Sequence, residues 1–267
     1  MSLRSLHSAA SGMQANNFQL DVIANNIANS GTTGFKQSRA NFEDVYYEHL
    51  KLPGVPDAQG NLTPIGKSVG LGTKVSGTQI DFTQGPLNVT EGQLDLAIAG
   101  EGFFEVVNPD GGQGFTRNGA FTLNSNGQVV LASSDVGRVL QPNITIPLNA
   151  QDVSIGSDGQ VTYRLAGDTA LTQAGQIQTT RFANSGGLLQ VGDSIYVPTD
   201  ASGAPVQGIP GTDGYGQIRQ NYLEESNVEP VKELVGLIKT QRNFELNSQV
   251  VQAADQALQL LANLRRF

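Results

Sequence analysis

The chain has 267 residues, with 16 Lys and Arg against 24 Asp and Glu, so its formal net charge is −8 at pH 7. This acidic balance argues against nucleic-acid binding, and no apolar run approaches the roughly 20 residues of a membrane span. Cysteine is absent, which excludes disulfides and thiolate metal sites, and 32 glycines with 6% aromatics indicate a soluble, turn-rich, largely β chain.

The first predicted element is an amphipathic helix that ends near Ser30. Its mostly apolar positions recur at spacings of three and four, which is the a/d pattern of a coiled-coil seam. These positions are Leu3, Leu6, Ala10, Met13, Asn17, Leu20, Ala24 and Ile27. The segment that follows, up to Lys36, is rich in Asn, Gly and Thr, which favours a turn.

The stretch Ala24-Asn-Asn-Ile-Ala-Asn-Ser-Gly-Thr-Thr-Gly-Phe-Lys36 resembles the N-terminal signature of the bacterial flagellar axial proteins, the family that builds the rod and hook. The continuation Arg39-Ala-Asn-Phe-Glu-Asp-Val-Tyr-Tyr47 most resembles the distal rod members of that family, and the length of the chain agrees with this resemblance. The domain organisation predicted from the sequence therefore begins with residues 1–36, the N-terminal helix and turn of a helical core domain.

Residues 37–72 are predicted to form an extended connector. Pro53 and Pro56, together with the turn residues around them, exclude a helix there. The segment could be a plain surface loop, or it could contact neighbouring subunits in a polymer. The family resemblance favours the second interpretation.

Residues 73–223 are predicted to form a central antiparallel β domain with barrel or sandwich character. Four hairpin dipeptides mark its turns: Asp110-Gly111, Asn118-Gly119, Asn126-Gly127 and Asp158-Gly159. Further strands are expected at residues 144–147, 160–165, 176–183 and 194–197.

Residues 224–267 are predicted to carry the C-terminal helix, which Pro230 can begin as a first-turn residue. One row recurs every seven residues and is apolar: Leu237, Phe244, Val251 and Leu258. A largely polar companion row is assigned to Leu234, Gln241, Ser248, Asp255 and Ala262. The stretches Glu224-Glu-Ser-Asn-Val228 and Gln241-Arg-Asn-Phe-Glu-Leu-Asn247 resemble the C-terminal signature of the same family.

Together these elements predict an α+β fold, with a discontinuous helical terminal domain, whose N- and C-terminal helices pair like a coiled coil, and a central antiparallel β domain. Both helical seams are interrupted by polar residues, and packing supplies most helical stability. We therefore expect the two ends to be mobile in the free subunit and to fold on assembly. The alternative is a helical hairpin that docks within its own chain.

No catalytic, cofactor or metal site is expected. The only histidines, His7 and His49, are predicted to face solvent, which makes a Ser-His-Asp triad or a multi-histidine metal site improbable. Glu224 and Glu225 are expected to stay solvated beside the start of the C-terminal helix.

The family resemblance implies a structural subunit that polymerises into a helical tube, transmits torque and encloses the export channel. It implies partners among other copies, other rod subunits, the hook protein and surrounding ring proteins, with no nucleic acid and no membrane insertion. The N-terminus lacks the pattern of a cleaved signal peptide, which taken alone indicates the cytoplasm. The family resemblance instead implies export through the flagellum, without a cleaved signal, to the periplasm and cell envelope. The predicted subunit-interface residues are Leu6, Met13, Leu20, Ile27, Asn25, Asn26, Asn29, Gly34, Phe35, Leu237, Phe244, Val251 and Leu258.

Two alternatives remain open at this stage. One is a proximal rod or hook-like subunit of the same family. The other is of a different class, a soluble β-domain binding protein whose terminal helices form an intramolecular hairpin.

Overall fold

The structure is a computed structural model that describes residues 3–54, 56, 62, 64–107, 111–132, 136–167 and 170–264. It divides into two compact units. The helical unit comprises residues 1–28, 38–79 and 229–267, and the β unit comprises residues 29–37 and 80–228. The α+β class is confirmed. The four domain boundaries drawn from the sequence remain a prediction.

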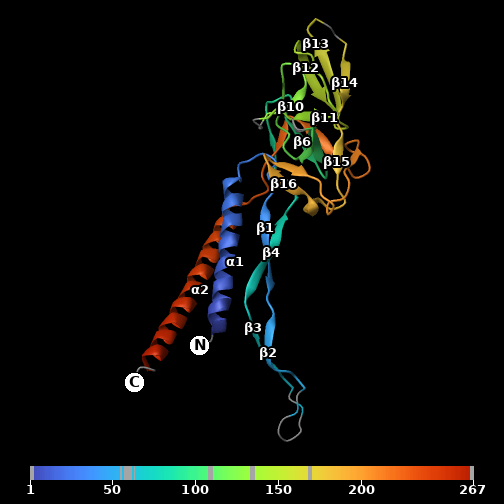
Figure 1. Ribbon diagram of the computed structural model, residues 1–267. Coiled ribbons are helices and arrows are strands. Elements are labelled where there is room, and N and C mark those ends of the chain that lie inside the picture. The colour runs from blue at the N-terminus through green and yellow to red at the C-terminus, as the bar shows by residue number, and fades with distance from the viewer. Residues whose placement is uncertain are drawn as a thin grey trace. The chain divides into compact units, whose positions relative to one another are not determined.

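The helical unit contains two long helices, α1 (Leu3–Ala28) and α2 (Pro230–Leu264), which pack along one another (Figure 1). Helix α2 begins at Pro230, as predicted, because a first-turn proline loses no helical hydrogen bond. Helix α1 ends at Ala28, close to the expected stop at Ser30.

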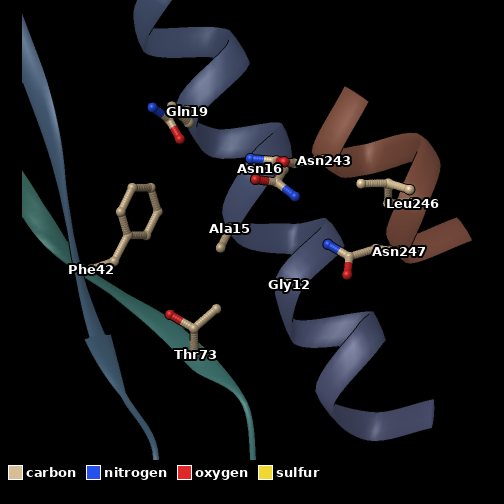
Figure 2. Close-up of a pocket in the computed structure, with 9 residues that line it drawn as sticks. All are labelled: Gly12, Ala15, Asn16, Gln19, Phe42, Thr73, Asn243, Leu246 and Asn247. Carbon is tan, nitrogen blue, oxygen red and sulfur yellow. The ribbon is translucent and has the colours of Figure 1, made fainter. Parts of the chain in front are cut away.

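Four strands complete the helical unit: β1 (Ser38–Asp44), β2 (Tyr47–Lys51), β3 (Lys67–Gly70) and β4 (Thr73–Ile80). Strand β1 pairs with β4, and β2 pairs with β3 in antiparallel fashion. Residues 37–72 therefore contain paired strands. Figure 2 shows α1 between α2 and the strand pair β1–β4.

Side-chain hydrogen bonds fix α1 to these strands. The Asn26 amide donates to the Ser38 carbonyl at 2.8 Å, and the Ser38 N–H donates to Asn26 Oδ1 at 3.0 Å. Near the other end of α1, the Thr73 N–H donates to Ser11 Oγ at 3.3 Å. Both faces of α1 that meet α2 and β1 are thus covered within one chain.

The β unit holds the remaining strands. Those of its main sheet are β7 (Phe103–Val107), β8 (Gln113–Thr116), β9 (Phe121–Leu123), β10 (Val129–Leu131), β11 (Val139–Gln141), β15 (Thr179–Arg181), β16 (Leu189–Gly192), β17 (Ile195–Val197) and β18 (Val206–Gly208). Their order is β16-β17-β8-β7-β11-β10-β9, with β15 pairing both β7 and β18, and these strands pair in antiparallel fashion.

Smaller sheets flank the main one. They are formed by β12 (Ala150–Ile155), β13 (Gln160–Leu165) and β14 (Thr172–Gln176), by β19 (Gln217–Gln220) with β6 (Leu96–Ala99), and by β20 (Tyr222–Glu224) with β5 (Leu87–Val89). A short 3-10 helix, η1 (Ser185–Gly187), precedes β16.

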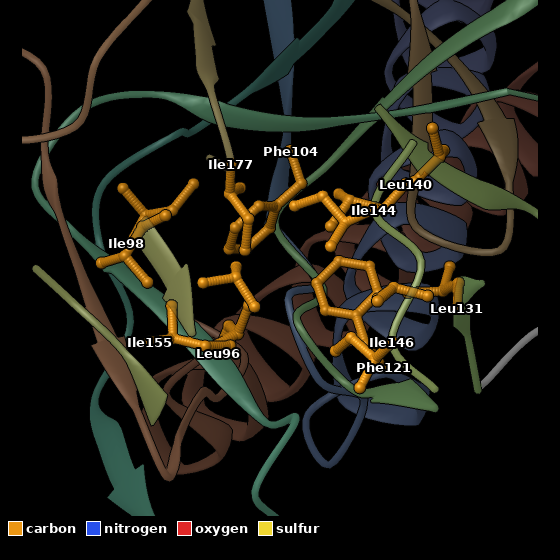
Figure 3. Packing of buried hydrophobic residues seen from close by; sticks show 14 of the residues in the cluster. Leu96, Ile98, Phe104, Phe121, Leu131, Leu140, Ile144, Ile146, Ile155 and Ile177 are labelled. Carbon is orange, nitrogen blue, oxygen red and sulfur yellow. The ribbon is translucent and has the colours of Figure 1, made fainter. Parts of the chain in front are cut away.

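Two apolar clusters form the core of the β unit. The larger one gathers aliphatic side chains from several sheets around Phe104 and Phe121, whose rings meet edge to face at 5.3 Å (Figure 3). The smaller one contains Phe103, Phe115, Leu188 and Tyr196. Because burial of apolar area is the main favourable term in folding, these clusters account for the stability of the β unit.

Two of the predicted hairpins are confirmed. Gly127 lies between the paired strands β9 and β10 and Gly159 between β12 and β13, with φ of 75° and 81° that favour glycine. The prediction of a hairpin at Asn118-Gly119 is wrong, because β8 and β9 do not pair. A Cβ on Gly119 would lie 1.6 Å from the Leu96 carbonyl oxygen, so this glycine permits a close approach to β6. Asp110 lies outside the described residues.

Of the four further strands predicted from the sequence, three are found and one is not. Residues 160–165 coincide with β13, and the stretches 176–183 and 194–197 contain the shorter strands β15 and β17. Residues 144–147 form no strand in the structure as described; they contribute one isolated bridge, between Gln128 and Thr145.

We predict that Phe104→Ala lowers the free energy of unfolding of the protein by about 3–5 kcal/mol, because it leaves a cavity in the larger cluster. The matched control is Leu171→Ala, which removes an exposed side chain and is expected to change this free energy by less than about 0.5 kcal/mol. Urea unfolding followed by circular dichroism measures both, and equal effects of the two changes would contradict the assignment of the core.

Candidate assembly surfaces and a buried charge cluster

Part of the predicted heptad row on α2 lies in the contact with α1. Leu237, Phe244 and Val251 are half-buried, whereas Leu258 is exposed. Their companions in the contact are Glu233, Thr240, Asn247 and Ala254, all half-buried or buried. The assignment of the companion row to Leu234, Gln241 and Asp255 is wrong for the single chain, since these three are exposed. The side chain of Ala262 lies outside the described residues.

The predicted row on α1 is likewise split. Leu6, Met13, Leu20 and Ile27 are half-buried, but their predicted companions are exposed, namely Ala10, Asn17 and Ala24. The buried residues of α1 are Ala9, Ala15, Ile23 and Asn26. The inner face of α1 is therefore rotated from the predicted seam, because this helix packs on β1 as well as on α2.

The contact between the helices is made largely by small and polar residues. A Cβ on Gly12 would lie 2.9 Å from Asn247 Nδ2, and Gly236 lies beside Ile23. Figure 2 shows Asn16 and Asn243 close together beside a cavity of about 340 Å³. The cavity is lined by Gly12, Ala15, Asn16, Gln19, Phe42, Thr73, Asn243, Leu246 and Asn247. Such a seam buries little apolar area, so it contributes little hydrophobic stabilisation.

The larger aliphatic side chains of α2 lie on its outer surface. Seven of them recur along the helix at helical spacings: Val231, Leu234, Val235, Ile238, Leu246, Val250 and Leu260. We call this set the outer stripe. It is exposed in the single chain, and exposed apolar surface of this kind marks interaction sites.

The predicted turn residues differ in burial: two are at least partly accessible, and two pack within the chain. Asn25 is exposed and Asn29 half-buried, and both remain predicted interface residues. Gly34 and Phe35 are buried in the β unit, where Gly34 has φ of 69° and donates its N–H to the Glu224 carbonyl at 2.8 Å. A Cβ on Gly34 would lie 2.5 Å from Asn118 N, so this position requires glycine for packing within the chain.

Glu224, at the end of β20, forms the centre of a buried charge cluster. Its Oε1 lies 2.5 Å from Lys36 Nζ, and its Oε2 lies 3.3 Å from Arg117 Nη1. The side chains of Lys36 and Glu224 are 0% exposed and that of Arg117 is 4% exposed. The expectation that Glu224 stays solvated is therefore wrong, although its neighbour Glu225 is exposed.

Additional hydrogen bonds satisfy this cluster. Lys36 Nζ also donates to the Thr83 carbonyl at 2.6 Å, and Gly85 N–H donates to Glu224 Oε1 at 3.0 Å. Burial lowers the pKa of Lys36, and Glu224 opposes that change. Burial also lowers the pKa of Arg117. One carboxylate thus serves two desolvated cations.

Sequence reasoning did not find this cluster. Lys36 and Glu224 both lie in the two family-like stretches, yet they are 188 residues apart and no local pattern relates them. A basic residue directly after a buried aromatic, and an acidic residue at the end of a strand, are the only signals available in the sequence.

The described residues form no recognisable catalytic or metal site. His7 and His49 are exposed, as predicted. Among the described residues, no group of three or more His, Asp or Glu side chains is placed to hold a metal ion. No helix in the described part of the chain is long and apolar enough to cross a membrane.

Comparison with known proteins identifies the class. Residues 6–36 match the family model for the flagella basal body rod protein, residues 97–163 match that for the flagellar hook protein FlgE/F/G D1 domain, and residues 219–264 match that for the flagellar basal body rod FlgEFG protein C-terminal region. The class is thus that of structural flagellar axial proteins, and the chain is not an enzyme.

Full-length relatives narrow the family further. The chain is 43% identical over 261 residues to the flagellar basal-body rod protein FlgG of Agrobacterium fabrum, covering 97% of this chain and 98% of the relative. It is 42% identical over 264 residues to FlgG of Caulobacter vibrioides, covering 98% of this chain and 100% of the relative. The match to the flagellar hook protein FlgE of Helicobacter mustelae, at 47% identity, covers only 48% of this chain and 28% of that protein. The chain therefore belongs to the FlgG family of flagellar basal-body rod proteins.

We predict that Glu224→Gln lowers the free energy of unfolding by about 3–5 kcal/mol, because it leaves two buried cations without their carboxylate. Glu225→Gln is the matched control, since it removes an exposed neighbouring charge and is expected to have an effect within about 0.5 kcal/mol. Chemical denaturation of both variants measures the difference. Similar stabilities for the two variants would show that the cluster does not hold the β unit together.

Proposed function

We propose that the protein is a structural subunit of the flagellar basal-body rod, in its distal segment, and that it polymerises into a helical tube that transmits torque and encloses the export channel. The observation that carries this proposal is the outer stripe of α2, exposed in a chain that matches rod proteins along nearly its full length. A rod subunit assembles with other axial components, so this face has partners available to it.

The pairing of α1 and α2 supports a coiled-coil-like helical core domain. Helix α1 is covered on two sides within its own chain, by α2 and by β1. Helix α2 keeps the outer stripe on its surface. A second copy that covers the stripe with a different surface makes a head-to-tail contact, and repetition of such a contact without closure produces a helical polymer.

The composition of the seam supports folding that is completed on assembly. Thr240 and Ala254 are the buried residues of α2, and Ala9, Ala15, Ile23 and Asn26 are those of α1. Because Ile23 is the only large aliphatic residue among them, the pair is expected to gain much of its stability from neighbouring copies. The predicted interface positions Leu6, Met13, Leu20, Ile27, Leu237, Phe244 and Val251 then act by supporting the pair, whereas Leu258 and the outer stripe meet neighbours.

The partners follow from this role: further copies of the chain, other rod subunits, the hook protein and the ring proteins around the rod. The location is the basal body in the periplasm. A proximal rod subunit is the nearest alternative within the family. A hook-like role is less favoured, because the hook relative matches only about half of this chain.

An intramolecular hairpin as the whole explanation is also less favoured. The helices do pack within one chain, yet among the described side chains of α2 their packing leaves Leu258 and the seven large aliphatics of the outer stripe exposed. A hairpin that served only to close its own fold would be expected to place these side chains in the seam in preference to Thr240 and Ala254.

We predict that Ile238→Asp prevents assembly and leaves the free subunit as stable as the wild type. Ile238 is 50% exposed in the single chain, and loss of its burial at an interface weakens association by about ten- to a hundredfold, from roughly 1.5–3 kcal/mol per buried side chain. Sedimentation of the purified chain over a concentration series measures assembly. Gln241→Asp places the same charge at an exposed polar position of α2 and is expected to assemble nearly normally; equal loss in both variants would reject the outer stripe.

We also predict that limited proteolysis of the free subunit removes both terminal helices before it cuts the β unit, because locally less stable regions open more often. Mass mapping of the fragments is expected to leave a resistant core that starts near residue 29 and ends near residue 228. In the assembled polymer the same sites should be protected. Resistance of α1 and α2 in the free subunit would refute folding on assembly while leaving the family assignment intact.

A further inference from the structure

The β unit contains a second cavity, distinct from the helical surfaces. Its volume is about 350 Å³, and its walls combine three phenylalanines with two arginines. The lining residues are Phe82, Glu101, Gly102, Phe103, Arg117, Arg181, Phe182, Ala183 and Ser185. Aromatic walls around a few convergent charged groups are typical of a binding site.

Arg117 is the buried cation of this cavity, and its hydrogen bonding is incomplete. Nη2 donates to the Gly100 carbonyl at 2.8 Å, and Nη1 makes only long contacts, 3.4 Å to the Ile98 carbonyl and 3.3 Å to Glu224. Nε is buried and has no hydrogen-bond partner anywhere in the described part of the chain. A buried guanidinium donor without a partner costs free energy, so an acceptor that reached this N–H through the cavity would stabilise the site.

A second buried donor belongs to the same aromatic cluster. The Tyr196 hydroxyl is buried and likewise lacks a hydrogen-bond partner among the described residues. Its ring packs edge to face on Phe82 at 5.1 Å and on Phe103 at 6.1 Å, two residues that line the cavity. Burial raises the pKa of this phenol above its usual range, so the hydroxyl keeps its proton at neutral pH.

The charge balance around Arg117 favours an anion. Arg117 shares its ion-pair partner, Glu224, with Lys36, and the more distant carboxylate of Glu101 also favours its charge. The second arginine of the cavity, Arg181, is half-exposed and is paired with the exposed Glu101, and it also stacks over Tyr215. The guanidinium of Arg117 on the inner wall is thus incompletely neutralised. Arg181 on the more exposed wall is paired with Glu101 and can exchange this partner for another carboxylate.

We propose that this cavity is a carboxylate site, which an acidic side chain of a neighbouring copy occupies in the assembled polymer. An arginine edge binds a carboxylate through two parallel N–H donors. The choice of a second copy follows from charge: the chain carries 24 acidic against 16 basic residues, so each copy presents carboxylates to its neighbours. The cavity itself does not depend on the proposed function, whereas its occupant does.

The first test uses the full-length subunit under conditions where it is monomeric, with sodium acetate as the probe. The Arg117 Nε–H signal in a proton–nitrogen NMR spectrum is expected to shift saturably with acetate, and not with sodium chloride at equal ionic strength. Ala183→Phe should abolish the shift by filling the cavity without removing a charge. Ala166→Phe, in the exposed turn between β13 and β14, is the matched control and should shift like the wild type.

An Arg117 signal that ignores acetate, or that responds equally to chloride, would overturn the carboxylate site. Persistence of the shift in Ala183→Phe, with its unfolding midpoint unchanged, would overturn the placement of the site in this cavity. Equal unfolding midpoints of Ala183→Phe and Ala166→Phe verify that both variants are folded.

The second test identifies the occupant. If a neighbouring copy supplies the carboxylate, Ala183→Phe should raise the critical concentration for assembly at least tenfold over Ala166→Phe. Normal assembly of Ala183→Phe would overturn the neighbouring copy as occupant. Acetate binding by a wild-type chain that never polymerises would refute the proposed function and this occupant together, while the cavity would stand as a carboxylate site.

Discussion

The structure depends on one long-range interaction, the burial of Glu224 between Lys36 and Arg117. It joins the turn after α1 to the last strand before α2, residues 188 positions apart. Two further hydrogen bonds join the same two segments. Gly34 N–H donates to the Glu224 carbonyl, and Gln37 N–H donates to Asn227 Oδ1 at 2.8 Å. The segments that adjoin the two helices in sequence are therefore held in one unit. Pairing of α1 with α2 then no longer requires closure of a long flexible loop, which lowers its entropic cost.

This cluster supplies specificity more than stability. Taking three charges out of water is costly, and a buried ion pair often contributes no more than apolar residues of similar volume would. Stability comes from the two apolar clusters around Phe104 and Phe103. What the charges add is a unique arrangement, because a mispaired turn would leave a buried lysine or arginine alone. The β unit thus has both a packed core and a buried ion-pair cluster, while the helical seam has neither a comparable core nor a buried ion pair among its described residues.

Local patterns allowed some elements to be predicted and could not reveal others. The apolar row of Leu237, Phe244 and Val251 and the turns at Gly127 and Gly159 follow from short-range spacing and turn chemistry, and these agree with the structure. The companion row on α2 was misassigned because buried Thr240 and Ala254 are less hydrophobic than exposed Leu234. Residue type alone does not indicate which side a neighbouring helix covers.

The strands within residues 37–72 and the burial of Glu224 were not predicted, for a different reason. Strands β1 to β3 in residues 37–72 acquire their identity from pairing, partly with β4 beyond the segment. From its position beside a helix start, Glu224 was expected to be solvated. The fold instead places Lys36 against it and buries both side chains. Ion pairs and strand pairs between distant segments leave no periodic trace in a sequence.

The two helices differ in a way that bears on where the next subunit attaches. Helix α1 meets α2 on one side and β1 on another, so its own chain covers two of its sides, and Phe18 is the large apolar residue that its described part exposes. Helix α2 meets only α1 among the elements with substantial contacts in the described chain, yet it carries large exposed aliphatics such as Val235 and Ile238 outside that contact. Copies with a net charge of −8 repel one another at long range. Association must therefore come from short-range burial, and the uncovered side of α2 is where the chain offers it.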